Sequence, residues 1–334
     1  MRDVWSRLLN FQSHDLIKKL YKIKHNRTLN ANKIKQISSN FIQAREYFRN
    51  YEQASYSVQP LLLYYGILSL SRGLILFLGD GITEAAMKQG HGLNTIQWSE
   101  ILSNGLKSIE KLEVKTCGGT FLELIEATTN KSYLRHNSSG VNNHQQYSSP
   151  SVGQILNLDG LLRTVPDLME EYSGWRGTPP LLFPISELKD EGAELNIKIP
   201  NRKYITEENL MKLFGHNARI TSPDQKNNYF TVSTSNKNLY LTQKFIDNFH
   251  IGQVFIGQGV TKEANLSVLC TFFCLSYYLG MLCRYFPSIW LSSEQTTQGD
   301  SVYPLIKKSL SLMFNYYPIL INDFLNTEPY EFEI

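Results

Sequence analysis

The stretch PLLLYYGILSLSRGLILFL at residues 60–78 decides the fold, because few polar side chains interrupt its apolar character. Hydrophobic side chains cover nearly every side of a helix formed by this segment, and such a helix is normally buried all round. Pro60 suits the first turn, where a missing N–H costs no hydrogen bond. The sequence Gly-Asp-Gly at residues 79–81 predicts the end of the helix. We therefore expect residues 60–78 to form a central helix against which other helices pack.

Helical patterns precede this segment and return near the other end of the chain. Residues 15–24 and 31–55 carry apolar side chains at steps of three and four, which predicts two amphipathic helices. Residues 263–285 and 304–325 predict two more. An amphipathic helix needs a partner for its apolar face, so we expect helices from both ends to pack into one body.

The middle of the chain has a different pattern. ELNIKI at 194–199 and YFTVST at 229–234 alternate between apolar and polar residues, which predicts strands. These segments predict an α+β fold, in which a predominantly helical body formed by N- and C-terminal helices carries an inserted antiparallel β-rich region. The expected parts are an N-terminal helical part at 1–127, a polar loop or linker at 128–153, a β-rich inserted part at 154–262, and C-terminal helices at 263–334 that pack on the N-terminal part.

Residues 266–283 carry no charged side chain, and a run of that length approaches what a membrane span needs. Hydroxyl side chains such as Ser267, Thr271 and Ser276 make it more polar than typical spans, so we expect a buried helix instead. Residues 1–9 contain no apolar run of the length of a secretion signal. The four cysteines show no paired framework of the kind secreted proteins use. We therefore expect a cytoplasmic protein without a membrane span.

The overall charge gives no strong signal for nucleic-acid binding. The 334 residues include 33 basic and 30 acidic side chains, for a net charge of +3. Residues 1–50 are nevertheless basic, with eleven Lys or Arg against three Asp or Glu. That region is either a solvated helix face, which we favour, or a surface for an acidic partner.

No catalytic, metal-binding or cofactor-binding motif emerges from the sequence. The phosphate-loop pattern G-x-x-x-x-G-K-[ST] and the nucleophile pattern G-x-S-x-G are both missing. Cys270 and Cys274 share a helix face, but no histidine accompanies them to complete a zinc site. We therefore expect a protein that is not an enzyme and that holds neither a metal nor a cofactor.

Polar side chains inside the two apolar helices form the candidate site. Tyr65 and Arg72 lie on one face of the first helix, and Tyr277 and Arg284, seven residues apart, share a face of the other. His91 lies between two glycines, which allow the backbone unusual angles there. A guanidinium near a core needs a partner. We predict a polar seam or partner-binding site from these five residues; the alternative is a purely structural set of contacts.

Several blocks of the sequence resemble the YaaC-like protein family. They include the run AREYF at 44–48, the run VQPLLLYYG at 58–66 and the GHGL element at 90–93. Near the other end, LGMLCRYFP at 279–287 with Trp290 is similar to that family's Arg-Tyr-x-Pro-x-x-Trp element, and residues 317–322 also fit.

Members of that family are known as sensors of bacterial phage defence in the jumbophage-killer type of system. The resemblance implies a cytoplasmic, non-enzymatic sensor or adaptor whose partners are a phage early protein and a separate effector protein. It leaves open whether the chain forms a homo-oligomer.

A second resemblance points to helical HEPN-type domains, some of which are ribonucleases. Their catalytic signature, Arg-x4–6-His, has one match here, at Arg7 and His14, which lies at the opposite end of the chain from its place in those domains. A HEPN-like ribonuclease or another RNA-binding helical protein is therefore the alternative function.

Overall fold

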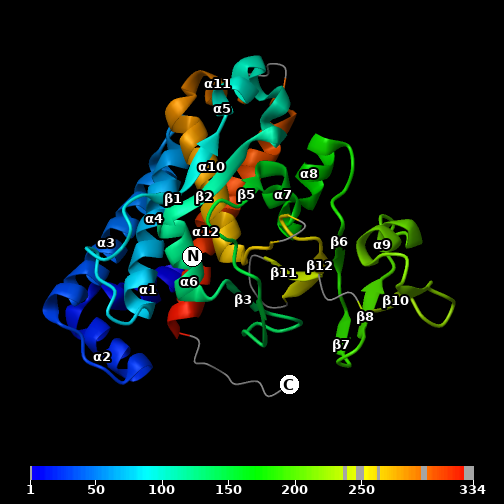
Figure 1. Cartoon of the computed structure of the whole chain (residues 1–334), viewed down its shortest axis with the longest axis horizontal. Coiled ribbons are helices and arrows are strands. Elements are labelled where there is room, and N and C mark those ends of the chain that lie inside the picture. Colours follow the sequence, from blue (N-terminus) through cyan, green and yellow to red (C-terminus); the bar gives the residue numbers. More distant parts are fainter. Residues whose placement is uncertain (1, 236–238, 246–251, 262–263, 295–298, 327–334) are drawn as a thin grey trace. The chain divides into compact units, whose positions relative to one another are not determined.

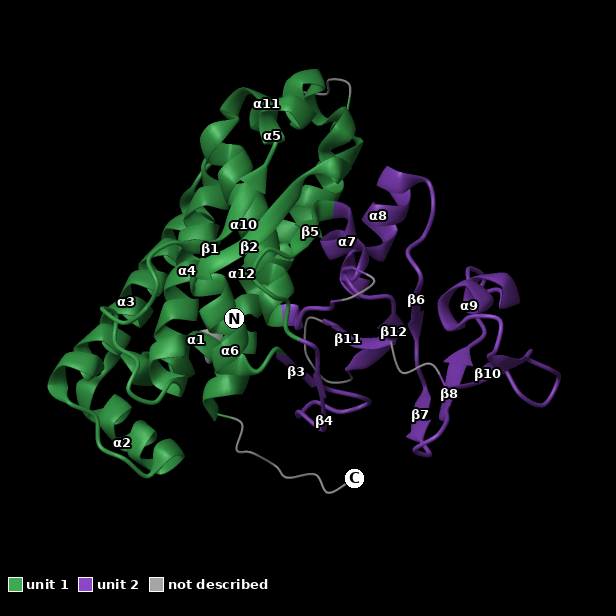
Figure 2. Cartoon of the chain, viewed as in Figure 1, with its two compact units in different colours: residues 1–130, 149–158, 269–334 green, residues 131–148, 159–268 purple. Residues whose placement is uncertain are grey.

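The computed structural model describes residues 2–235, 239–245, 252–261, 264–294 and 299–326, and the chain divides into two compact units. Figure 1 shows its elements in chain order and Figure 2 colours the two units. Unit 1 comprises residues 1–130, 149–158 and 269–334. Unit 2 comprises residues 131–148 and 159–268. The first unit is thus built from both ends of the chain, and the second from its middle.

Unit 1 is predominantly helical. Its helices are α1 (Arg2–Leu8), η1 (Leu9–Gln12), α2 (His14–His25), α3 (Ala31–Gln53), α4 (Gln59–Leu78), α5 (Trp98–Ile101), η2 (Leu102–Lys111), α6 (Thr120–Thr128), α10 (Val268–Tyr285), α11 (Pro287–Ser292), η4 (Asp300–Val302) and α12 (Tyr303–Asn326). Its strands β1 (His91–Ile96), β2 (Glu113–Gly119) and β5 (Ile155–Asn157) form one antiparallel sheet with β2 in the middle.

Helix α4 is the centre of unit 1. It packs against α3, α6 and α12. Two glycines let α3 approach closely, since a Cβ atom at Gly66 would lie 2.7 Å from Phe48 and one at Gly73 would lie 2.8 Å from Phe41. Because α3 and α12 come from opposite ends of the chain, their shared contact with α4 joins those ends.

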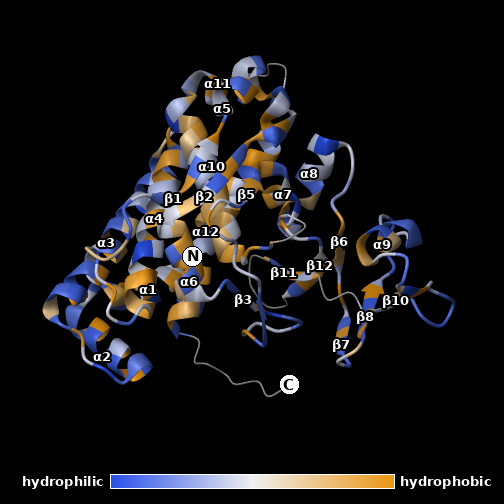
Figure 3. Ribbon diagram, viewed as in Figure 1, coloured by the Kyte–Doolittle hydropathy of each residue, from blue (hydrophilic) through white to orange (hydrophobic). Residues whose placement is uncertain are grey.

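The two most apolar helices are core helices of this unit. Helices α4 and α10 are long and apolar enough to cross a membrane by length and composition, yet most of each is buried within the fold. Figure 3 shows the contrast between the hydrophobic residues of α10 and α12 and the largely hydrophilic α2. Burial against protein explains their composition without a bilayer.

Unit 2 is rich in antiparallel strands. Its strands are β3 (Lys131–Leu134), β4 (Asn143–Gln146), β6 (Leu182–Pro184), β7 (Glu187–Asp190), β8 (Leu195–Pro200), β9 (Arg219–Thr221), β10 (Tyr229–Thr234), β11 (Tyr240–Lys244) and β12 (Gln253–Gly257). They form the sheets β7-β8-β10-β9, β11-β12-β6 and β3-β4. Its helices are α7 (Leu158–Arg163), η3 (Pro166–Leu168), α8 (Met169–Arg176) and α9 (Glu207–Phe214).

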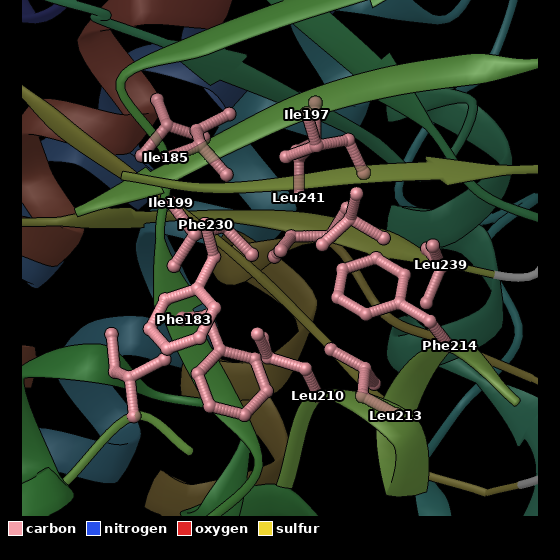
Figure 4. Close-up of a cluster of buried hydrophobic side chains, with 14 of the residues drawn as sticks. Phe183, Ile185, Ile197, Ile199, Leu210, Leu213, Phe214, Phe230, Leu239 and Leu241 are labelled. Atoms are coloured by element: carbon pink, nitrogen blue, oxygen red, sulfur yellow. The ribbon is translucent and has the colours of Figure 1, made fainter. Parts of the chain in front are cut away.

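A cluster of buried apolar side chains lies at the core of unit 2. Figure 4 shows side chains from its strands and from α9 gathered in one cluster. Ile197 and Ile199 of β8 and Val232 of β10 are fully buried there, as their alternation in sequence predicts. Helix α9 begins after Thr206, whose hydroxyl accepts a hydrogen bond from the Asn209 N–H at 3.2 Å.

The predicted α+β class with helical N- and C-terminal regions is confirmed. The prediction of an exposed polar loop at 128–153 needs a correction, because part of that segment is a β-hairpin. Strand β3 pairs with β4 in antiparallel register, from Lys131 with Gln146 to Leu134 with Asn143. Leu134 is fully buried in the unit 2 core, whereas the residues of β4 are largely exposed. The polar composition therefore describes the outer strand of the hairpin rather than a structureless loop.

Candidate functional site

His91 is held at the start of β1 by an irregularity between β1 and β2. His91 pairs with Gly119 and Leu93 with Thr116, so the register shifts between the two pairs. Gly92 has φ +83° and Gly119 has φ +146°, and a Cβ atom at Gly92 would lie 2.6 Å from the Phe121 backbone nitrogen. Only glycine fits such backbone geometry, and a bulge of this type redirects the neighbouring side chain. The two glycines thereby place the His91 ring beside α4.

The imidazole of His91 meets the hydroxyl of Tyr64. The Tyr64 Oη atom lies 2.5 Å from His91 Nδ1, and Tyr64 itself is fully buried on α4. Gly280 of α10 makes room for this tyrosine, because a Cβ atom there would lie 2.8 Å from the Tyr64 Cβ. When the single ring proton of neutral His91 is on Nε2, the Tyr64 hydroxyl donates to Nδ1.

Tyr277 completes a compact ring cluster with these two residues. Its ring centroid lies 5.7 Å from the Tyr64 ring at an angle of 77°, and 5.7 Å from the His91 ring at 54°. The Tyr64 and His91 centroids are 5.5 Å apart. Edge-to-face packing of this kind fixes ring orientation and adds a modest stabilisation. Burial raises the pKa of Tyr277 to about 12, so its hydroxyl is neutral at physiological pH.

Arg284 forms the exposed side of the cluster. Its Nη1 donates to the Tyr65 hydroxyl at 2.9 Å, and its guanidinium lies 5.1 Å from the centroid of the Tyr285 ring. Tyr65 in turn stacks on Tyr47 of α3, with the centroids 5.8 Å apart. No carboxylate of the described residues lies within ion-pair distance of Arg284. Its charge is therefore held in place by aromatic groups and remains available to a partner.

The electrostatics of the cluster favour a neutral imidazole. Burial, and then the positive charge of Arg284, lower the pKa of His91 from its ordinary value of 6.5. Burial also raises the pKa of Tyr64. The cluster therefore places a neutral imidazole, whose Nδ1 is engaged by the buried Tyr64 hydroxyl, beside the permanent cation of Arg284.

The Cys117 thiol, which adjoins the cluster, is not activated. Burial raises the pKa of Cys117, which lies on β2 and interacts electrostatically with Tyr277. A nucleophilic cysteine needs the opposite, a lowered pKa beside a cation or a helix N-terminus. In the described part of the chain, no three His, Cys, Asp or Glu side chains gather to hold a metal ion. Cys117 therefore has neither of the features that activate a cysteine.

Four of the five residues predicted from sequence come together. The cluster contains Tyr65, His91, Tyr277 and Arg284. The two helix faces meet where Arg284 of α10 donates a hydrogen bond to the Tyr65 hydroxyl of α4. Arg72 lies half-buried further along α4 and makes no hydrogen bond or ion pair with the described residues.

The residue that sequence analysis missed is Tyr64. It adjoins Tyr65 in sequence, so it points away from the polar face on which the prediction was based. The pair of adjacent tyrosines could have indicated Tyr64, because a phenol inside an otherwise aliphatic helix also needs a hydrogen-bond partner. Ser69, which lies between Tyr65 and Arg72 on α4, donates to Gln43 of α3 at 3.1 Å and does not join the cluster.

The ribonuclease signature is spread over two helices. Arg7 lies in the last turn of α1, whereas His14 is the first residue of α2 and is exposed. The 3-10 helix η1 separates them. This placement gives no support to a shared catalytic face.

Comparisons with known proteins identify the family. No curated protein and no solved structure matched the chain. The model of the YaaC-like protein family matches residues 9–325, a span that includes all of the site just described. The chain therefore belongs to the YaaC-like protein family.

Proposed function

We propose that this protein is a non-enzymatic sensor or adaptor of a bacterial antiphage defence system. In this role it binds a phage early protein and recruits a separate effector protein. Membership of the YaaC-like family supports the proposal, because members of that family are known as sensors of bacterial phage defence. The proposal requires recognition surfaces and does not require an active site.

The observation that carries the proposal is the arginine–aromatic surface at the end of α10. Arg284 is exposed and Tyr285 is 60% exposed, while the tyrosines and the imidazole behind them are packed and fixed. Arginine and tyrosine dominate the energetics of protein interfaces, above all where a rigid base holds them. A guanidinium on such a base, with no carboxylate partner among the described residues, favours a protein partner that offers a carboxylate or a carbonyl.

The experiment is a phage plating assay on cells carrying the native locus. Deletion of the gene should abolish protection. The Arg284→Glu variant should also lose protection, because reversing the charge repels a carboxylate that Arg284 would pair with. Arg284 is exposed, so the variant should keep the wild-type circular dichroism spectrum and melting temperature.

The matched control is Lys107→Glu, which makes the same charge change at another exposed cation of unit 1. This variant should retain full protection. Undiminished protection after deletion of the gene would sink the proposal. Equal loss of protection in both variants would assign the effect to net charge rather than to the α10 surface.

The ribonuclease alternative makes an opposite prediction. Purified protein incubated with single-stranded and structured RNA should leave both intact. If it cleaved RNA, and His14→Ala or His91→Ala abolished the cleavage, the non-enzymatic proposal would be wrong.

A further inference from the structure

A cleft in unit 1 lies apart from the His91 cluster. Side chains of α1, α3 and α12 line it, and its volume is about 640 Å³, in the range of ligand pockets. Phe48 and Phe314 form an aromatic floor, with their rings stacked at 5.7 Å. The Trp5 ring meets Phe48 edge-on at 5.2 Å. Leu9, which is 38% exposed, contributes a further apolar wall.

Two cations stand along one side of this cleft. Arg45 and Arg49 of α3 are four residues apart, so they project from adjacent turns of one helix face. Both are exposed, and neither makes a hydrogen bond or an ion pair with the described residues. Among the described residues that line the same cleft, Glu52 is the one acidic side chain. The cleft therefore combines an apolar floor with a positive charge that the described part of the chain leaves unmatched.

We propose that this cleft binds a short acidic segment of a partner protein. Two carboxylates of the segment pair with Arg45 and Arg49, and a large apolar side chain fills the space beside Trp5 and Leu9. The spacing fits, because β-carbons four apart on a helix are about 6 Å apart. Residues two apart in an extended peptide are separated by roughly 6.6 Å and point the same way.

The chemistry of the cleft favours a peptide over a nucleic acid. Glu52 lies three residues after Arg49, so the positive charge on this face is limited to the turn between Arg45 and Arg49, a length that suits two carboxylates better than a continuous phosphate backbone. The two rings of the floor are also recessed, since Phe48 is 2% and Phe314 is 8% exposed, so neither of them presents an open face on which a base could stack. A single apolar side chain with flanking carboxylates satisfies both features.

This inference rests on the proposed function only for the role of the partner, because the cleft would be the docking surface for the protein that is recruited. Binding of a peptide to the cleft can be tested without reference to phage defence. A fluorescein-labelled peptide of about eight residues with the pattern Phe-Glu-Ser-Glu is titrated with the full-length protein, and binding is followed by anisotropy. A matched peptide carries glutamine in place of both glutamates.

The acidic peptide should bind the wild-type protein more tightly than the glutamine peptide. The double variant Arg45→Gln with Arg49→Gln should weaken binding of the acidic peptide by about tenfold or more, and should leave binding of the glutamine peptide unchanged. The control, Lys18→Gln with Lys35→Gln, removes the same charge from exposed positions outside the cleft and should change affinity less than about twofold.

Three outcomes would overturn the inference. Equal affinity of the protein for the two peptides would show that the arginines do not pair with the carboxylates of the acidic peptide. Equal losses in the two double variants would indicate general charge attraction. A single-stranded RNA oligonucleotide that displaced the peptide at lower concentration, dependent on Arg45 and Arg49, would assign the cleft to nucleic acid. If the wild-type protein did not bind the acidic peptide although cells carrying it kept full phage protection, this inference alone would be rejected and the proposed function would stand.

Discussion

The two ends of α4 each meet a half-buried histidine, and the two histidines have opposite surroundings. At the C-terminal end, His25 Nε2 donates to the Phe77 carbonyl at 3.0 Å, and Lys33 Nζ donates to the Gly79 carbonyl at 2.6 Å. At the N-terminal end, His91 meets a side chain, the Tyr64 hydroxyl, next to an exposed arginine. One histidine caps backbone; the other belongs to a side-chain cluster that opens to solvent.

The difference between the partners of His25 and His91 distinguishes polar groups that complete a helix end from polar groups that helix formation does not require. The carbonyls at a helix C-terminus lack intrahelical partners, and cations there also complement the helix dipole. His25 and Lys33 therefore meet a need that any buried helix end has. Nothing in helix formation requires the cluster around His91, so its placement by two glycines calls for a different explanation. Substitutions at the two ends should accordingly affect different measured quantities.

The largest effect is expected at the bulge that holds His91. Gly92→Ala should lower the free energy of unfolding by about 3 kcal/mol or more, measured by urea denaturation. Two costs combine there, because φ is +83° and the new Cβ would lie 2.6 Å from the Phe121 backbone nitrogen. Gly81→Ala, just beyond the other end of α4, is the matched control. Its φ is +71° but the Cβ would meet open space, so about 1 kcal/mol is expected.

Equal losses for the two glycine variants would mean that the β1–β2 bulge relaxes freely. In that case the backbone would not fix the position of His91, and the comparison between the two ends of α4 would lose its basis.

A smaller effect distinguishes the cations at the two ends. Lys33 is 4% exposed, and Lys33→Met removes its hydrogen bond to the Gly79 carbonyl, so the free energy of unfolding should fall by about 1–2 kcal/mol. Arg284→Met removes an exposed hydrogen bond to Tyr65 and should cost less than about 0.5 kcal/mol. If Arg284→Met were the more destabilising variant in urea titrations, the α10 surface would be structural.

Most of this architecture could be predicted from the sequence, because the hydrophobic patterns of its helices and strands are local. The strand at 229–234 alternates strictly, and β10 occupies those same residues. The apolar segment at 60–78 predicted α4 within one residue at its start. Such patterns are local, so one chain segment is enough to reveal them.

The candidate site was predicted less completely, because its contacts join distant segments. That Tyr64 meets His91, 27 residues later, depends on the β1–β2 register shift, which no local pattern specifies. Arg72 was included because it shares a helix face with Tyr65, but it makes no hydrogen bond or ion pair with the described residues. The cleft at Arg45 and Arg49 was visible only as an excess of basic residues in the first fifty.

The pH dependence of stability should reflect both histidines. Burial is the first cause that lowers the pKa of His25 and of His91 below 6.5. The unfolded chain then binds more protons than the folded chain as the pH falls below about 7, so the free energy of unfolding must decrease. The loss is complete once the pH is below both folded pKa values.

Urea denaturation between about pH 7.5 and about pH 5.5 measures this slope, a range in which carboxylates change little. The double variant His25→Gln with His91→Gln should have a flatter profile. A wild-type free energy of unfolding that rose as the pH fell would contradict the assignment of both histidines as neutral in the folded protein.

The smallest expected effect is also the most specific. After burial, the charge of Arg284 is the second cause that lowers the pKa of His91, so Arg284→Gln should raise that pKa, as followed by NMR titration of the imidazole protons. The pKa of His25 should stay unchanged, because its charged neighbours are Lys24, Lys33 and Asp80. Asp80→Asn should do the reverse, lowering the pKa of His25 and leaving that of His91. If either variant moved both histidines together, the two ends of α4 would form one coupled electrostatic system, and the α10 surface could not be altered without disturbing the cap at the opposite end of the helix.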